Sequence, residues 1–558
     1  MIDPVRLMRA PDEIMRLDRL GAAFPTRLSF MRVLVRRMAR EQWQFSKPLD
    51  TLDENGFGHV VYTVNTGSRC YSLVAFSHDL DPGQRSDRVI ADAWDATFNL
   101  FDGIPDNEDI LRLARNTPRQ EAGRFSQDEL VLARANKSER LFNHVVDALT
   151  TGQQPDLAQV IKVGYLMRTT AVYGSGKFGC ADRNKIAGRE EINGSFQVEM
   201  LTVYLIRLFA IDLAEHIARA RNPGASQLAP ELRSLIGIGN ATGLGMAPFL
   251  VNHQVLLHKW VYAKELALAR IRSIASFPPS IAADLSLTLR QAQLHIRHWQ
   301  VDDSEQKQRI NDLQGDLLEL NTRLPDLLTQ PQPGNAIFSW VDENLGLEAR
   351  ELIISVLLEC NADQVDDLGE DMLAELDDAW DPAMTVKEVA MRLDSLYPWI
   401  TGIDPDLPET SHRIWYYSAE KLEPRLGTRA KNPDLMAEMP LAIGRDVARL
   451  KKQLSTQSDE QTMLQFCAAH PGLRHVVKRV QTSSQFPYSE IADNLLGESF
   501  RPIDLLRFKL AYFGATAFDP KSALWTRVTM YQGAPLPDQL STRNADNWAF
   551  PLAEVTTS

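Results

Sequence analysis

Residues 57–77 read FGHVVYTVNTGSRCYSLVAFS, and this stretch decides the fold of the N-terminal region. Val, Tyr, Phe and Cys are concentrated in two runs, 57–65 and 68–77, which flank the tripeptide Asn65-Thr66-Gly67. Two such runs around a turn that contains Asn and Gly are typical of a β-hairpin. Residues 88–100 are expected to add a third strand. The sequence therefore predicts a small antiparallel β-sheet near the N-terminus.

The rest of the chain is predicted to be helical. From residue 106 onward, apolar residues recur with the period of an α-helix over most of the sequence. The fold class that we predict is mainly α (α+β), with a body of long helices beside the small sheet. A segment at 500–537 mixes aromatic and small residues and is expected to add one or two strands. The predicted helices span 107–116, 126–150, 155–172, 190–221, 247–276 and 281–325.

A strongly basic helix is expected to begin at Pro25 or Thr26. Its apolar residues recur at intervals of 3, 4 and 3, and arginines occupy many of the other positions. One face is therefore predicted to pack and the other to be basic. We weigh a docking surface for a nucleic acid or an acidic partner against a solvated face, and favour the solvated face. The apolar residues are Leu28, Met31, Val35 and Met38, and the arginines are Arg27, Arg32, Arg36, Arg37 and Arg40.

Three further patterns suggest how the chain is divided. A heptad seam is expected to end before Pro325 and to pack within the chain rather than in a dimer. The sequence Gln-Pro-Gln-Pro-Gly at 330–334 is the best candidate for a linker. An acidic helix with an apolar underside is expected within 363–381. We predict three regions, 1–105, 106–328 and 335–558. The seam consists of Ile310, Leu313, Leu317, Leu320 and Leu324.

The overall composition is that of an ordinary globular protein. Of the 558 residues, 44% are hydrophobic and 24% are charged, and this length is enough for several domains. The composition excludes disordered, collagen-like and disulfide-scaffold proteins. The net charge of −13 argues against nonspecific binding of nucleic acids.

The cysteines favour a reducing, cytoplasmic location. They are far apart in the sequence and form no C-x-x-C pair, so neither a zinc site nor a disulfide scaffold is predicted. The N-terminal residues lack the basic-then-apolar order of a secretory signal. The most apolar stretch, 201–214, contains Arg207 and Asp212 and is too short to span a membrane, so we expect no membrane helix. The cysteines are Cys70, Cys180, Cys360 and Cys467.

The first candidate site is a Gly-rich, basic stretch within residues 168–199. Its glycines expose backbone N–H groups beside several basic side chains, and such loops bind oxyanions. A glycine-rich connector with solvated bases is an alternative of equal weight. The stretch does not fit a P-loop, because Ala171 and Phe178 stand where the motif needs glycine and a hydroxyl. Tyr173 is a predicted catalytic residue, and the predicted substrate-binding residues are Arg168, Ser175, Lys177, Arg183 and Asn193.

The second candidate is the Gly-rich stretch GIGNATGLGMAP at residues 237–248. Dinucleotide binding is disfavoured, because Thr242 stands where the fingerprint needs its third glycine and the preceding residues predict a helix. A helix that begins near Pro248 would offer backbone N–H groups to a carboxylate or phosphate. Asn240 and Asn252 are predicted to bind substrate. His253 is predicted to act as a general acid or base, with a hydrogen-bonded structural histidine as the alternative.

A third cluster, in 413–429, adds Tyr417, Lys421 and Arg425 as predicted substrate-binding residues. Ser418 and Lys421 match the spacing S-x-x-K, but the partner motif K-T-G is absent, so an acyl-enzyme is not expected. No metal site is predicted, because the pair formed by His295 and His298 has no obvious third ligand.

Together these stretches predict a cytoplasmic enzyme that holds a small anionic molecule, a carboxylate or a phosphate, and uses acid–base chemistry. A cofactor-independent lyase fits the residues better than redox or phosphoryl transfer. The fumarase and aspartase lyases also carry a Gly-Ser loop with Lys and Asn beside long helices, although their Met-Pro-x-Lys-x-Asn core is missing here. Two alternatives stay open: a helical protein-interaction scaffold, and a flavin or nicotinamide oxidoreductase. The long apolar helices also predict a homodimer.

Overall fold

The computed structural model forms two compact units, each built from separate segments of the chain. Unit 1 comprises residues 1–22, 244–282 and 322–509, and unit 2 comprises 23–243, 283–321 and 510–558. The structure describes residues 3–22, 24–81, 93–117, 126–174, 188–192, 194, 196–240, 254–299, 301, 304–372, 379–402, 415–418, 424–426, 438–440, 443–491, 507, 510–512, 514, 517–519 and 527–548.

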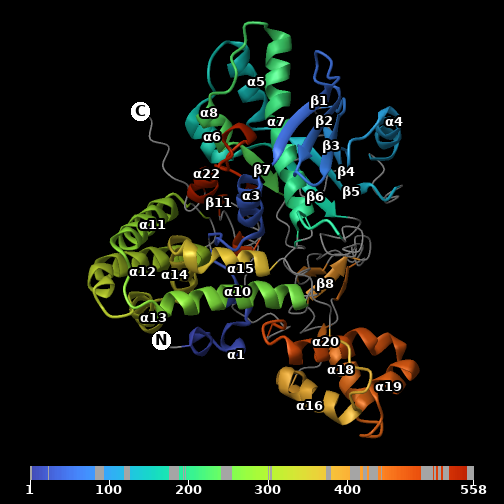
Figure 1. The fold of residues 1–558 in the computed structure, drawn as a ribbon, viewed down its shortest axis with the longest axis vertical. Helices are drawn as coiled ribbons and strands as arrows, with labels where there is room; N and C mark the ends of the chain where they lie inside the picture. The colour runs from blue at the N-terminus through green and yellow to red at the C-terminus, as the bar shows by residue number, and fades with distance from the viewer. Residues whose placement is uncertain are drawn as a thin grey trace. The chain divides into compact units, whose positions relative to one another are not determined.

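A mixed sheet of nine strands lies at the centre of unit 2 (Figure 1). Its strands follow the order β1-β2-β3-β4-β5-β6-β7-β12-β11. This sheet overturns the prediction of a mainly α fold with only a small N-terminal sheet, because the strands extend through much of the N-terminal half. The fold is mixed α/β. The strands are β1 (Gln44–Asp50), β2 (Gly58–Asn65), β3 (Cys70–Ser77), β4 (Ala96–Asp102), β5 (Glu129–Lys137), β6 (Tyr165–Gly174), β7 (Gly237–Asn240), β11 (Ala517–Asp519) and β12 (Arg527–Met530).

The predicted hairpin is confirmed. β2 and β3 pair along their whole length, and Asn65 pairs with Cys70 at the turn. The side chain of Asn65 accepts a hydrogen bond of 2.8 Å from the backbone N of Gly67. Gly67 has a φ of 92°, a left-handed conformation that favours glycine. The third predicted strand is present as β4, and the strands expected near the C-terminus are β11 and β12.

Two predicted helices are wrong because strands of the sheet run through them. The range 126–150 contains β5 ahead of the helix α5 (Phe142–Thr150). The range 155–172 contains most of β6 after the short helix α6 (Leu157–Val163), which ends at Gly164 with a φ of 77°. β5 is almost completely buried, so it lacks the alternation that marks a half-exposed strand.

Helices cover both faces of the sheet. On one face, Phe209 of α7 (Gln197–Arg221) packs on Phe98 of β4, with ring centroids 5.4 Å apart. On the other face, Ile110 of α4 (Asn107–Asn116) joins a hydrophobic cluster with Phe101 of β4. Because Phe98 and Phe101 are three positions apart on one strand, they project from opposite faces. The apolar side chains of α7 are largely buried within the chain, and the homodimer stays a prediction.

The basic helix near the N-terminus is α3 (Phe30–Arg40), and its expected apolar face is confirmed: Leu28, Met31, Val35 and Met38 are fully buried. The expectation that all five arginines are solvated is wrong. Arg32 is completely buried, with its guanidinium 5.8 Å from the ring centre of Trp548. Arg27 is also buried and forms an ion pair of 3.0 Å with Asp546. These two arginines therefore belong to the interior of unit 2.

The predicted helix 281–325 consists of two helices, α11 (Pro279–Arg297) and α12 (Ser304–Leu328). They pack together: the side-chain amide of Gln293 donates a hydrogen bond of 2.7 Å to the carbonyl of Leu317. All five residues of the heptad seam are buried, so the seam packs within the chain as expected. The expected end of the helix before Pro325 is wrong, because α12 continues through this residue. The remaining helices of unit 2 include α8 (Pro230–Leu235) and α22 (Thr542–Asn547).

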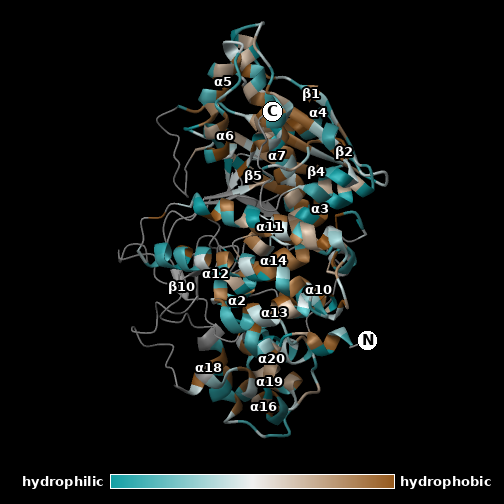
Figure 2. Ribbon diagram, turned by 90° about the vertical axis from the view of Figure 1, so that its left-hand side faces the viewer, coloured by the Kyte–Doolittle hydropathy of each residue, from teal (hydrophilic) through white to brown (hydrophobic). Residues whose placement is uncertain are grey.

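Unit 1 is mainly helical, and its helices are amphipathic. α16 buries Val386, Val389 and Leu393 along one side, and it carries brown and teal residues in Figure 2. A small sheet has the strand order β10-β8-β9, with β8 (Trp415–Ser418), β9 (Pro424–Leu426) and β10 (Glu438–Pro440). The helices of unit 1 include α10 (Gln254–Ser273), α13 (Pro333–Asn344), α14 (Leu347–Cys360), α15 (Asp366–Asp371), α16 (Val386–Leu396), α18 (Ile443–Leu454), α19 (Met463–Ala469) and α20 (Arg474–Gln485).

The predicted linker at 330–334 packs closely against the rest of unit 1. The backbone N of Gln332 donates a hydrogen bond of 3.0 Å to the carbonyl of Ala275. A Cβ atom at Gly334 would lie 2.5 Å from the carbonyl oxygen of Ile271. The division of the chain into three regions stays a prediction. Among the described residues, no helix combines the length and the hydrophobicity needed to cross a membrane.

Candidate functional site

In the part of the sheet that the structure describes, β6 and β7 are the one parallel pair, and a Gly-rich stretch follows each of them. Their pairing aligns Arg168 with Gly239 and Thr169 with Asn240. Parallel strands run toward the same edge of a sheet. β4 runs in the same direction, because β4 and β6 both pair antiparallel with β5. We call the edge at which β4 and β6 end the carboxyl edge, defined by their last residues, Asp102 and Gly174. β7 runs toward this edge and ends at Asn240, which aligns with Thr169 of β6.

Residues 189–191, which follow the glycines of the first Gly-rich stretch, are held at the carboxyl edge by contacts with β3 and β4. Arg189 forms an ion pair with Asp102, the last residue of β4, and its Nε lies 3.0 Å from Oδ2. Glu191 accepts a short hydrogen bond from the hydroxyl of Tyr71, which is paired with Asp102 across β3 and β4. Residues 189–191 are therefore an anchor at this edge.

Arg37 of α3 makes a third contact with this anchor. The guanidinium of Arg37 donates hydrogen bonds of 3.2 and 3.0 Å to the carbonyl oxygens of Glu190 and Glu191. Burial and the neighbouring Glu191 carboxylate raise the pKa of Tyr71 well above its ordinary value. Because the phenol stays protonated at physiological pH, Tyr71 serves as a hydrogen-bond donor to Glu191 and not as a base.

The glycines at the start of the second stretch have a packing role. Gly237 and Gly239 lie within β7, between β6 and β12. A Cβ atom at Gly237 would lie 2.3 Å from the carbonyl oxygen of Met530, and one at Gly239 would lie 2.8 Å from the ring of Tyr165. These two glycines are therefore explained by close contact with neighbouring strands.

Three predicted site residues fall on β6 and β7. Arg168 lies in β6 and is 9% exposed. Tyr173 pairs with Leu132 of β5, one position before the end of β6, and Asn240 is the last residue of β7. The backbone therefore places Arg168, Tyr173 and Asn240 on the two strands that lead to the carboxyl edge. Outside the described residues lie the predicted site residues Ser175, Lys177, Arg183, Asn193, Asn252 and His253, whose roles stay predictions.

The third cluster belongs to unit 1. Tyr417 pairs with Pro424, and Arg425 pairs with Tyr416, in the small sheet formed by β8, β9 and β10. The predicted Lys421 lies outside the described residues. This cluster therefore belongs to a different compact unit from the carboxyl edge.

His295 of α11, one member of the histidine pair, has a structural explanation. The ring of His295 lies 5.5 Å from that of Phe24 and 5.9 Å from that of Trp299. Burial lowers the pKa of His295 to about 4, so the ring is neutral near pH 7. Within the described ranges, no group of three or more His, Cys, Asp or Glu side chains is arranged to hold a metal ion.

Comparison of the chain with protein-family models, with curated proteins and with solved structures finds no match in any of the three. The functional interpretation of the carboxyl edge therefore depends on the geometry and chemistry of this chain alone.

The anchor formed by residues 189–191 was not predicted from the sequence. Asp102 follows the strand predicted at 88–100, and Arg189 and Glu191 follow the basic residues of the first candidate stretch. The sequence therefore drew attention to both regions of the chain. The pairing that brings these residues together cannot be seen in the local sequence, because Arg189 and Asp102 are 87 positions apart.

Proposed function

We propose that the protein is an enzyme that binds a small anionic substrate, a carboxylate or a phosphate, at the carboxyl edge of unit 2. The reaction is acid–base chemistry of the lyase type. The observation that supports this proposal best is the parallel pairing of β6 with β7, because both strands run toward the carboxyl edge and both carry residues of a Gly-rich stretch. In open parallel α/β sheets, ligands bind outside the carboxyl ends of the strands, and β6 and β7 of this sheet have the parallel arrangement.

The proposal gives the residues separate roles. Lys177 and Arg183, which follow β6 in the sequence, bind the anionic groups of the substrate. Tyr173, the second-last residue of β6, transfers a proton. The ion pair between Arg189 and Asp102 fixes the far end of the stretch that carries both cations. An anion site needs donors that are held in place before the substrate binds, and the anchor holds one end of this stretch.

The test is thermal-shift screening with citrate, succinate and inorganic phosphate at matched ionic strength. A true ligand stabilises the folded protein by mass action. Lys177→Ala and Arg183→Ala should each weaken the stabilising anion about ten- to a hundredfold, because each removes a charge-assisted contact of roughly 1.5–3 kcal/mol. Lys162→Ala, on the exposed side of α6, is the matched control and should leave binding unchanged. Equal stabilisation of the wild type and both loop variants would contradict the proposal.

A second assay separates binding from chemistry once a substrate is found. Tyr173→Phe should lower turnover by on the order of a hundredfold while the affinity for the anion stays within about threefold. A loss of affinity with unchanged turnover would instead assign Tyr173 to binding.

We further propose that the enzyme works in the cytoplasm as a homodimer. Among the described residues, Cys70 and Cys467 are free thiols, which suits a reducing compartment. Leu287 and Leu294 lie two turns apart on α11 and are 49% and 39% exposed, so they are available for a contact between copies. Light scattering at micromolar concentration tests the dimer, and Leu287→Glu should convert it to a monomer.

A further inference from the structure

The N-terminal segment of unit 1 is held by a buried network of charges. The guanidinium of Arg9 contacts Glu265 of α10 at two points, with Nη2 2.7 Å from Oε1 and Nε 2.9 Å from Oε2. The same guanidinium donates a hydrogen bond of 2.8 Å from Nη1 to Glu351 of α14. The side chains of Arg9, Glu265 and Glu351 are at most 3% exposed. One arginine of the N-terminal segment therefore joins two helices that lie far from it in the sequence.

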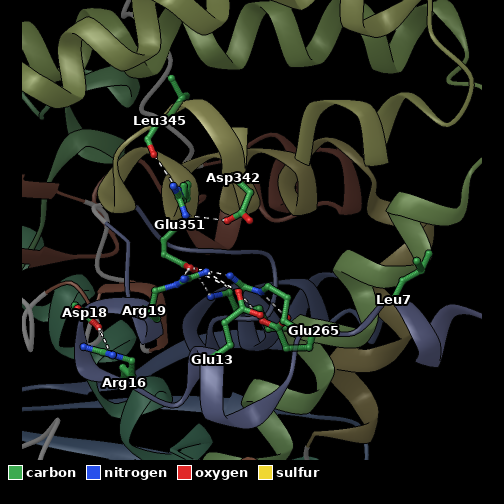
Figure 3. Close-up of polar contacts among 12 residues, drawn as sticks. Leu7, Glu13, Arg16, Asp18, Arg19, Glu265, Asp342, Leu345 and Glu351 are labelled. Atoms are coloured by element: carbon green, nitrogen blue, oxygen red, sulfur yellow. Dashed lines mark hydrogen bonds and ion pairs between the residues drawn. The ribbon is translucent and has the colours of Figure 1, made fainter. Parts of the chain in front are cut away.

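A second arginine of the segment reaches the same carboxylate. Arg19 donates from Nε to Oε1 of Glu351 over 2.9 Å, and Lys264 of α10 lies 3.1 Å from Oε2. Figure 3 shows Arg19, Glu265 and Glu351 gathered at one point, while Arg16 and Asp18 pair to one side. Without the N-terminal segment, the two buried glutamates would keep only Lys264 of these three cations. A buried carboxylate without a counter-charge is strongly destabilising.

The segment also makes backbone contacts with unit 1. The carbonyl of Arg9 accepts a hydrogen bond of 2.8 Å from the hydroxyl of Tyr488, and the carbonyl of Leu7 accepts one of 2.7 Å from Arg272. Ile14, Met15 and Leu20 are at most 2% exposed. The contacts therefore include charge, backbone and apolar groups along most of residues 3–22.

The segment has too little regular structure to fold alone. It contains only η1 (Pro4–Leu7), α1 (Pro11–Ile14) and α2 (Leu17–Leu20), which have four residues each. Isolated helices of this length are unstable in water. Its order therefore comes from docking, and in the sequence 221 residues of unit 2 separate it from the next segment of unit 1.

We propose that the face of α10 and α14 that carries Glu265 and Glu351 is a recognition site for an arginine-bearing segment. The chain's own residues 3–22 occupy it and dock and release as one arm. The site selects two guanidinium groups ten positions apart, Arg9 and Arg19, with apolar residues between them. This inference is independent of the function proposed for the carboxyl edge.

The experiment uses the full chain with Arg9→Met and a synthetic peptide of residues 3–22. The variant weakens its own arm, so the wild-type peptide should bind in trans and restore thermal stability. The same peptide with Arg9→Met should bind at least about a hundredfold more weakly, because truncating one partner of a buried charge pair has effects of this size. A peptide with Arg16→Ala is the matched control, since Arg16 is exposed and pairs only with Asp18 at 3.5 Å among the contacts that the structure gives it. A folded variant that gains nothing from the wild-type peptide would overturn the proposal.

If the Arg9→Met variant does not fold, hydrogen exchange on the wild-type chain tests the proposal instead. Release of the arm as a unit predicts that the amides of Ile14 and Leu20 exchange with similar opening constants, at least about tenfold larger than those of buried amides in α10. Opening constants equal to those of α10 would show that the arm leaves only when unit 1 unfolds, and would overturn the proposal.

Discussion

The ring of Tyr165 lies directly against Gly239, so closely that a Cβ atom at Gly239 would be 2.8 Å from three ring atoms. The two residues belong to the neighbouring strands β6 and β7, which lead to the carboxyl edge. The contact fixes how closely β6 and β7 can approach each other. It also leaves no room for a side chain at position 239 of the second Gly-rich stretch.

Gly239→Ala should therefore destabilise unit 2 by about 1–3 kcal/mol, the usual cost of overpacking a filled core. Urea unfolding followed by circular dichroism measures this change. The control is Gly315→Ala on an exposed turn of α12, where nothing lies within 4 Å of the new Cβ. Gly315→Ala should stabilise the protein by roughly 0.5–1 kcal/mol, because alanine is the better helix former. Equal effects of the two changes would contradict the assigned contact.

Two buried asparagines on neighbouring strands should respond in opposite ways. Asn99 of β4 is fully buried, and its side-chain amide has no hydrogen-bond partner within the described structure. Asn136 of β5 accepts a hydrogen bond of 2.9 Å from the backbone N of Asp95 and donates one of 3.1 Å to Ala93. Asn99→Leu should stabilise the protein by about 1 kcal/mol, and Asn136→Leu should destabilise it by about 1–3 kcal/mol. Thermal unfolding of the two variants tests this, and a loss with Asn99→Leu would point to a bound group at that amide.

The stability of unit 1 should depend on pH through Glu351. Burial alone would raise the pKa of this carboxyl, but the charges of Arg9 and Lys264 lower it far below its usual value. The contribution of Glu351 is therefore fully present above the unfolded pKa of about 4.3 and is lost as the pH falls further toward the folded value. Comparison of wild type and Glu351→Gln by urea unfolding between pH 7 and pH 3 should show a difference that shrinks only below about pH 4.3. A difference that fades between pH 7 and pH 5 would contradict the assignment.

Two histidines of unit 1 should have pKa values on opposite sides of the ordinary histidine pKa of about 6.5. Burial lowers the pKa of His258 to about 4, and its Nδ1 accepts a hydrogen bond of 3.1 Å from the backbone N of Tyr488. The hydrogen bond with Asp446, at 2.8 Å, raises the pKa of His475. Stability linked to His258 should fall as the pH drops below about 6.5, whereas that linked to His475 should be lost as the pH rises above its folded pKa. NMR titration of the imidazole protons measures both values, with His258→Gln and His475→Gln to assign the signals.

The sequence predicted elements well where local signals and solvent exposure coincide. The hairpin around Asn65 carries its own turn residues, and α4 was predicted with its observed bounds, 107–116. The helix α4 has an exposed face and a capping box at Asp106, so its period and its start are both visible locally.

The buried strands were missed for a physical reason. β5 and β6 lie in the middle of the sheet, and their residues Leu, Ala, Met and Arg are also good helix formers. A strand buried on both faces has no polar alternation, so period alone cannot separate it from a helix. Gly164, which ends α6 in a left-handed conformation, was the one local sign that the helix stops.

The candidate site was predicted only in part for the same reason. Composition and glycine spacing drew attention to both stretches, but only strand pairing shows that they belong to neighbouring parallel strands. Similarly, the arginines of α3 predicted a basic face, whereas Arg32 is buried next to Trp548, more than 500 positions away in the sequence. Contacts of this range leave no trace in local periodicity.

The pairing of β7 with β12 has a consequence for biosynthesis. Val528 pairs with Asn240, so one edge of β7 has no neighbour until the ribosome has added nearly 290 further residues. At roughly 5–20 residues per second this takes between about 15 s and one minute. An unpaired strand edge is a template for aggregation during that time. The nascent chain is therefore most vulnerable between synthesis of the second Gly-rich stretch and synthesis of the last strands, and a transcript cut short before residue 527 would leave that edge of the sheet permanently open.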